Sequence, residues 1–204
     1  SILNAALHQS DKIVTACFYK ENKITRSHKY FNTNELHEGF IDFDLEGENK
    51  VIREFKAVND EKDTVYSFAA QTAIVAGYLS KNVAKEKLNL ELPIKYTGNL
   101  NSFFVLDIDE DIEKDTIPAL KNAVVIMGYL GDPTGNQYDI EDKHFTPLNP
   151  KYTGKSAPDM FGVLIHANII KMLINKSFIN VTPNYISYVL AFLISFIFIL
   201  ISLV

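Results

Sequence analysis

The stretch from Pro158 to Val204, "PDMFGVLIHANIIKMLINKSFINVTPNYISYVLAFLISFIFILISLV", contains two helix patterns of different character. In its first part, Pro158–Lys176, Met160, Val163 and further apolar residues recur at helical spacing, which predicts an amphipathic helix packed on a core. In its second part, Ser177–Val204, there is no Asp, Glu, Lys, Arg or His. The chain therefore divides into a soluble domain and an apolar C-terminal segment.

The apolar segment predicts a transmembrane helix. Only three serines interrupt the apolar residues of Tyr185–Val204. A helix of this length reaches about 30 Å, the thickness of the hydrocarbon core of a bilayer. Thr182 before Pro183 predicts an N-cap followed by proline at the first helical position. The alternative is a buried C-terminal helix of a soluble protein.

We expect an α/β domain over residues 1–180 and a transmembrane helix over residues 183–204. Because the chain starts with Ser1 and ends within the apolar segment, we expect the domain to lack an N-terminal part and the helix to be cut short. The balance of 20 Lys and Arg against 25 Asp and Glu, without a long basic cluster, argues against a nucleic-acid partner. Cys17 lies in an apolar run and is expected to be a buried, inert thiol.

The residues before Pro158 alternate between strand and helix patterns, which predicts a mixed sheet with helices on its faces. "GFIDFDLEGENKVIREFKAV" at Gly39–Val58 predicts an antiparallel hairpin around a turn at 46–50. The other predicted elements are the end of a helix at 1–8, a helix at 66–79, and strands at 12–19, 92–98, 102–108 and 121–132.

The strongest candidate for a ligand site follows the predicted strand "KNAVVIMGYLGD" at Lys121–Asp132, because ligands bind at the carboxyl ends of strands in α/β proteins. Gly128, Gly131 and Gly135, at the end of this strand and after it, lack the spacing of a phosphate-binding loop. A divalent metal is an alternative, since carboxylates and imidazoles are suitable ligands. Its candidate ligands are Asp132, Asp139, Asp142, His144 and His166. The simpler interpretation is that the aspartates form turns and that His166 is a core residue bonded to a loop carbonyl.

No enzyme signature is complete. The acidic run Leu106–Asp115 begins like a calcium loop, but Ile112 and Pro118 replace the required glycine and glutamate. Cys17 has no evident base, and no serine stands in a nucleophile elbow. We therefore expect no catalytic residue, no metal and no cofactor.

Several segments, taken in order, resemble a CHASE-type extracellular sensory domain of the second class. In that family a strand similar to Val124–Gly128 is followed by an Asp four residues before a Thr-Pro pair, here Asp142 with Thr146 and Pro147. A "GVeiHAnai" helix, similar to Gly162–Ile170, then precedes the membrane spans. The resemblance covers most of Gly39–Val204; the family's opening membrane helix and "WPW" stretch are absent.

The resemblance implies a ligand-sensing domain at the cell membrane, outside the cytoplasm, coupled through membrane helices to a kinase or nucleotide cyclase. It implies a small-molecule or peptide ligand and allows a homodimer through membrane helices. The expected ligand-binding residues are Gly128, Gly131, Asp132, Asp142, Thr146, His166 and Asn168. Two alternatives stay open: a membrane-tethered metal-dependent hydrolase using Asp132, Asp142, His144 and His166, or a membrane-anchored protein-interaction module.

Overall fold

The structure is a computed structural model that describes residues 2–7, 9–20, 23–31, 36–43, 51–60, 64–106, 117–131, 140–149 and 156–202. The predicted turn at 46–50, the acidic run 107–115, Asp132 and Asp139 lie outside the described residues. The helices are α1 (Ile2–Leu7), α2 (Phe68–Val75), α3 (Lys81–Lys87), α5 (Gly162–Ile174) and α6 (Asn184–Ser202), with 3-10 turns at Leu100–Ser102 and Pro118–Leu120. The strands are β1 (Val14–Lys20), β2 (Lys23–Thr25), β3 (His37–Phe40), β4 (Glu54–Lys56), β5 (Val58–Asn59), β6 (Val65–Tyr66), β7 (Glu91–Pro93), β8 (Lys143–His144) and β9 (Met160–Phe161).

The predicted α/β class with a mixed sheet is confirmed. A three-stranded sheet has the order β2-β1-β3, in which β1 pairs antiparallel with β2 and parallel with β3. The parallel register sets Val14 opposite His37 and Cys17 opposite Phe40. The remaining described strands form antiparallel pairs, β4 with β7, β5 with β6 and β8 with β9. Cys17 is buried as predicted, and burial raises the pKa of its thiol to about 11.

The hairpin predicted over Gly39–Val58 is wrong. Its first strand, β3, pairs with β1, and its second strand, β4, pairs with β7. An antiparallel hairpin instead joins β1 and β2. The two halves separate because they fill different cores: Phe40 packs with Cys17 and Val65, whereas Ile52 and Phe55 enter the larger core around α5.

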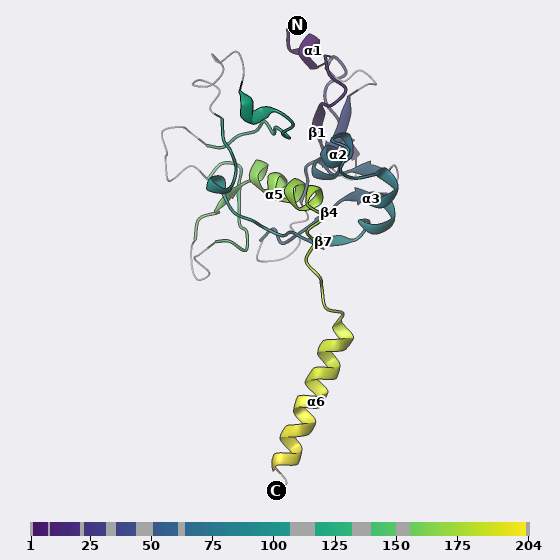
Figure 1. Cartoon of the computed structure of the whole chain (residues 1–204), viewed down its shortest axis with the longest axis vertical. Coiled ribbons are helices and arrows are strands. Elements are labelled where there is room, and N and C mark those ends of the chain that lie inside the picture. The colour runs from purple at the N-terminus through teal and green to yellow at the C-terminus, as the bar shows by residue number, and fades with distance from the viewer. Residues whose placement is uncertain are drawn as a thin grey trace.

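The larger core surrounds α5, which lies between α2 and the segments that follow β7 (Figure 1). The helix predicted within Pro158–Lys176 is confirmed as the shorter α5, and ten of its 13 residues are buried, so the core covers it on nearly all sides. The predicted core helix at 66–79 is confirmed as the shorter α2. Its buried face is mostly alanine, which allows close approach to α5.

Gly39 of β3 lies against the backbone at the start of α2. A β-carbon added to Gly39 would lie 2.5 Å from Phe68 Cα and 2.7 Å from Phe68 N. The neighbouring Ser67 is the N-cap of α2, and its hydroxyl accepts a hydrogen bond from Ala70 N at 3.2 Å. The missing side chain at Gly39 therefore lets the sheet and α2 meet backbone to backbone.

Two predicted strands do not form in the described residues. Phe103–Leu106 follows a 3-10 turn and pairs with no strand in the part described. Ala123–Leu130 also pairs with no described strand, although its side chains alternate as in a strand. Three of them pack on the larger core and three are exposed. The packed residues are Val124, Ile126 and Leu130, and the exposed ones are Val125, Met127 and Tyr129.

The C-terminal helix α6 projects away from the rest of the protein (Figure 1). It begins directly after Pro183, one residue later than predicted. Its Tyr185–Ser202 window is long and apolar enough to cross a membrane, and none of it is buried against the protein. The helix is therefore not buried against the part of the chain that the structure describes. Residues 175–183 join α5 to α6.

Candidate functional site

The first turn of α5 brings together a carboxylate and an imidazole predicted from the sequence. Pairing of β8 with β9 sets His144 opposite Met160 and brings Asp142 to the start of α5. The backbone nitrogen of Gly162 donates to the Asp142 carbonyl at 3.0 Å. A β-carbon at Gly162 would lie 3.4 Å from Asp142 Oδ1 and 3.5 Å from His144 Nε2. Both side chains therefore lie beside a helix N-terminus, which favours negative charge.

His166, one turn further along α5, is buried between aromatic rings. Its ring stacks on Phe43 with centroids 4.8 Å apart and meets Phe68 edge-on at 5.5 Å. Desolvation lowers the pKa of His166 to about 4; an interaction with the Ile41 backbone opposes this effect and His144 adds to it. The ring is thus neutral at pH 7. Contact with the Ile41 backbone agrees with the prediction of a core histidine bonded to a loop.

One ring nitrogen of His166 makes no hydrogen bond to a described residue. The side chain is 8% exposed, and its Nδ1 has no hydrogen-bond partner among the residues that the structure describes. Buried polar atoms are normally hydrogen-bonded, so an exception needs an explanation. We define the α5 N-terminal cluster as Phe43, Asp142, His144, Gly162 and His166.

Asn168 is fully buried, and both ends of its amide are engaged. Its Oδ1 accepts from Thr97 N at 2.8 Å and from Thr97 Oγ1 at 3.1 Å. Its Nδ2 donates to Gly98 O at 3.0 Å and to Leu164 O at 2.9 Å. These bonds fasten the loop after β7 to α5.

Thr146 also holds the frame of the site. Its Oγ1 donates to Asp159 Oδ2 at 2.6 Å, and its backbone nitrogen donates to Asp159 Oδ1 at 2.8 Å. The Asp159 nitrogen in turn donates to the His144 carbonyl at 3.0 Å. Sequence reasoning missed Asp159, whose only local signal is an acidic residue shortly before a helix. It missed Phe43 as well, because only the tertiary fold sets that ring against His166.

The two predicted glycines shape the segment that crosses α5. A β-carbon at Gly128 would lie 2.8 Å from Val163 Cγ2, so this glycine allows the segment to pack on the first turn of α5. Gly131 has a φ of 92°, which favours glycine. Asp132, the next residue, lies outside the described residues. Gly128 and Asp142 therefore lie against the first turn of α5, and His166 lies on the next turn of the same helix.

A metal centre finds little support in the described part of the chain. No group of three or more His, Cys, Asp and Glu side chains gathers there; Asp142 and His144 make a pair. Asp142 has a φ of 56° in the turn before β8, as the turn interpretation of the sequence predicts.

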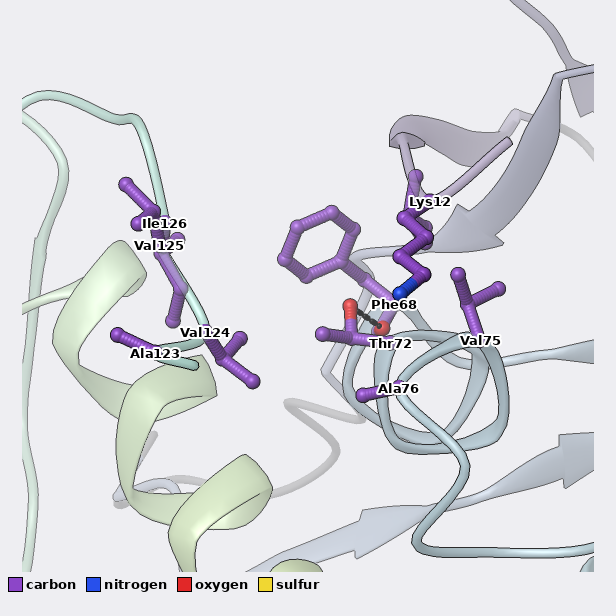
Figure 2. Close-up of a pocket in the computed structure, with 10 residues that line it drawn as sticks. Lys12, Phe68, Thr72, Val75, Ala76, Ala123, Val124, Val125 and Ile126 are labelled. Atoms are coloured by element: carbon purple, nitrogen blue, oxygen red, sulfur yellow. Dashed lines mark hydrogen bonds between the residues drawn. The ribbon is translucent and has the colours of Figure 1, made fainter. Parts of the chain in front are cut away.

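A cleft of about 280 Å³ lies between α2 and the segment that leads to Gly128. Figure 2 shows Ala123–Ile126 forming one wall, with α2 and Lys12 forming the other. The lining is aliphatic apart from Phe68, Thr72 and Lys12. Sequence reasoning placed a site after this segment and missed the cleft, because only the fold brings Lys12 and α2 to face it.

Comparison with known proteins identifies the family. A family model described as the CHASE2 domain matches residues 1–204, the whole chain, so the match also includes the residues before Gly39. Neither a curated protein nor a solved structure matches the chain. The chain therefore belongs to the CHASE2 domain family, a family of extracellular sensory domains.

Proposed function

We propose that this chain is the extracytoplasmic ligand-sensing domain of a transmembrane receptor, with α6 as a membrane-spanning helix. Ligand binding passes a conformational change through the membrane helices to a cytoplasmic kinase or nucleotide cyclase. Membership of the CHASE2 family supports the sensory role. The observation that carries the proposal is the placement of α5, which starts at the α5 N-terminal cluster and ends nine residues before α6.

The packing of α5 supports coupling of this kind. A helix buried on nearly all sides moves as a unit, because close-packed cores transmit displacement rather than absorb it. The residues just after α5 are tied to the core: Ser177 N donates to Met172 O at 3.1 Å, and Lys95 Nζ bonds to Ser177 Oγ. The stiff part thus extends to Ser177, which leaves residues 178–183 before the membrane helix.

The chemistry of the cluster supports a ligand that donates hydrogen bonds. The neutral ring of His166 has an Nδ1 without a described partner, and the Asp142 carboxylate accepts only. We propose that Asp142 and His166 face the ligand, with Gly128, Gly131 and Asp132 in the adjoining loop. Thr146 and Asn168 belong to the frame. A small molecule or short peptide is the proposed ligand, and a homodimer through α6 is the proposed assembly.

Accessibility of the membrane boundary tests the coupling. Single cysteines are placed between Val181 and Ser187 of the full chain in nanodiscs and are labelled with a membrane-impermeant maleimide. The native Cys17 is buried with a raised thiol pKa, so the unaltered chain serves as the labelling blank. The probes are amino acids, dipeptides, sugars and short carboxylates, selected first by whether they raise the unfolding temperature.

A stabilising probe is expected to change the labelling rate at some positions and not at others, as a rotation or shift of α6 requires. His166→Gln should weaken this response to probes bound at the cluster, whereas the exposed His28→Gln should leave it intact. Stabilisation of the domain with unchanged labelling at every position would contradict the proposal.

A further inference from the structure

We propose that the cleft between α2 and Ala123–Ile126 binds an apolar monocarboxylate, such as a short- to medium-chain aliphatic acid. The binding site is inferred from the cleft itself. Its role as a ligand site of the sensor rests on the proposed function. The lining of the cleft contains no residue of the α5 N-terminal cluster, but the two adjoin at Phe68, which lines the cleft and meets the His166 ring edge-on at 5.5 Å.

The size and lining of the cleft define the apolar part of the ligand. Its volume of about 280 Å³ is just below the range of roughly 300–1,000 Å³ for small-molecule sites, which suits a small ligand. Both walls are apolar over most of their area, so a hydrocarbon chain can lose its contact with water against them. The aliphatic lining residues are Val14, Val75, Ala76, Ala123, Val124, Val125 and Ile126, and Phe68 adds one aromatic ring.

The charge of the cleft defines the polar part. Lys12 is the one charged residue among the described lining, and Figure 2 shows its ammonium reaching over α2 toward Thr72. The ion pairs found between described residues engage Arg26 and Lys85 instead. The Thr72 hydroxyl already donates to Phe68 O at 2.7 Å. Lys12 is therefore the side chain available to donate to an anion.

The same lining excludes neighbouring ligand classes. No Asp or Glu lines the described cleft, so the ammonium group of an amine, a zwitterionic amino acid or a peptide would find no partner there. One lysine compensates one negative charge, which disfavours phosphates and di- or tricarboxylates. An apolar body with a single carboxylate satisfies both the walls and the charge.

The position of the cleft connects it with α5. Val124 and Ile126 on its wall pack on the larger core, and two residues further on Gly128 touches Val163 of α5. A ligand that contacts both walls fixes this segment relative to α2. The segment then has one position on the first turn of α5, which is the helix that leads to α6.

Hydrogen exchange on the full chain in nanodiscs tests the site, with sodium octanoate as the probe. Octanoate is expected to slow amide exchange in peptides covering 123–131 and in α2, and to leave α3 unchanged. Octanol and octylamine enter lipid as octanoate does but lack the carboxylate, so they serve as controls for bilayer effects. Neither is expected to protect the two walls.

Substitutions at Lys12 test the charge. Lys12→Met should weaken octanoate binding about tenfold, the loss of one charge-assisted contact. The affinity of Lys12→Arg for octanoate should stay within about threefold of that of the native chain. Lys121 is exposed and lies outside the lining, so Lys121→Met should bind octanoate as the native chain does. Ala76→Phe places a ring in the cleft and should abolish protection. Equal protection by octanol, or unchanged affinity in Lys12→Met, overturns the inference.

The two proposals fail separately. If octanoate protects both walls while cysteine labelling between Val181 and Ser187 is unchanged, the binding site stands and coupling through α5 is wrong for it. If another probe alters the labelling while octanoate protects neither wall, sensing stands and this site is wrong.

Discussion

Replacing His166 by glutamine should remove a pH-dependent loss of stability that the native protein shows under mildly acidic conditions. The ring has an ordinary pKa of 6.5, and burial lowers the pKa in the folded protein to about 4. As the pH falls from 6.5 toward 4, the unfolded chain binds a proton that the folded chain does not, so stability falls. Below pH 4 both states carry the proton and this loss is complete.

The magnitude follows from the two pKa values. The difference between 6.5 and about 4, at about 1.36 kcal/mol for each unit of pKa, corresponds to about 3 kcal/mol. A small domain has a total stability of about 5–15 kcal/mol, so this contribution is large enough to measure. This stability contribution of the neutral ring is fully present above pH 6.5 and is lost by pH 4.

Urea unfolding of the full chain in nanodiscs, followed by far-ultraviolet circular dichroism at several pH values between 7.5 and 3.5, measures the effect. Carboxylates titrate in the same range, so the quantity compared is the difference between native and variant curves. His166→Gln is expected to lose about 3 kcal/mol less than the native chain between pH 7 and pH 4. Its stability at pH 7 can fall through lost stacking on Phe43 without affecting this comparison.

The exposed His28→Gln is the matched control and should follow the native pH profile. If His166→Gln and the native chain lose stability in parallel, to within about 0.5 kcal/mol, the ring is not held neutral by burial, and the account of the α5 N-terminal cluster fails with it.

Three further changes test the frame of the site and the helix beyond it. Asn168→Ala leaves several buried or half-buried groups unpaired and should cost about 2–4 kcal/mol in urea unfolding. Asn99→Ala removes two exposed bonds, one donated to Asp159 O and one accepted from Leu100 N, and should cost about 1 kcal/mol. Gly128→Val should destabilise by about 1–3 kcal/mol through its clash with Val163, and adding Val163→Ala should restore much of that loss; equal costs in the single and double variants would refute the contact. Leu193→Arg near the middle of α6 should cost about 2.5–3.5 kcal/mol of insertion free energy, seen as less chain resistant to carbonate extraction; unchanged extraction would count against a membrane span.

The helices could be predicted from the sequence because each carries its own evidence. The period of Phe68–Val75 indicates α2, and the absence of charge after Lys176 indicates an apolar helix, with no knowledge of neighbours needed. Strand pairing has no such local signal. Gly39–Val58 and Ala123–Leu130 both show strand-like alternation, yet β3 pairs with β1 and the second segment packs beside α5.

The candidate site was likewise predictable only where the signal is local. His166 and Asp142 stand out as titratable residues next to apolar runs, and the fold does bring both to the start of α5. Whether a polar side chain is engaged depends on partners far along the chain. Asn168 bonds to a loop about 70 residues earlier, and Lys12 faces a wall more than 100 residues away in sequence, which no spacing rule encodes.

The contact between Gly39 and Phe68 bears on how a genetic screen of this protein should be interpreted. Any residue with a β-carbon at Gly39 would collide with main-chain atoms that cannot rotate away. A screen for substitutions that abolish function should therefore recover changes at Gly39 as readily as changes at a functional site. The amount of folded protein separates the two classes, because a collision at Gly39 depletes the folded chain whereas a lost contact at a functional site leaves its amount unchanged.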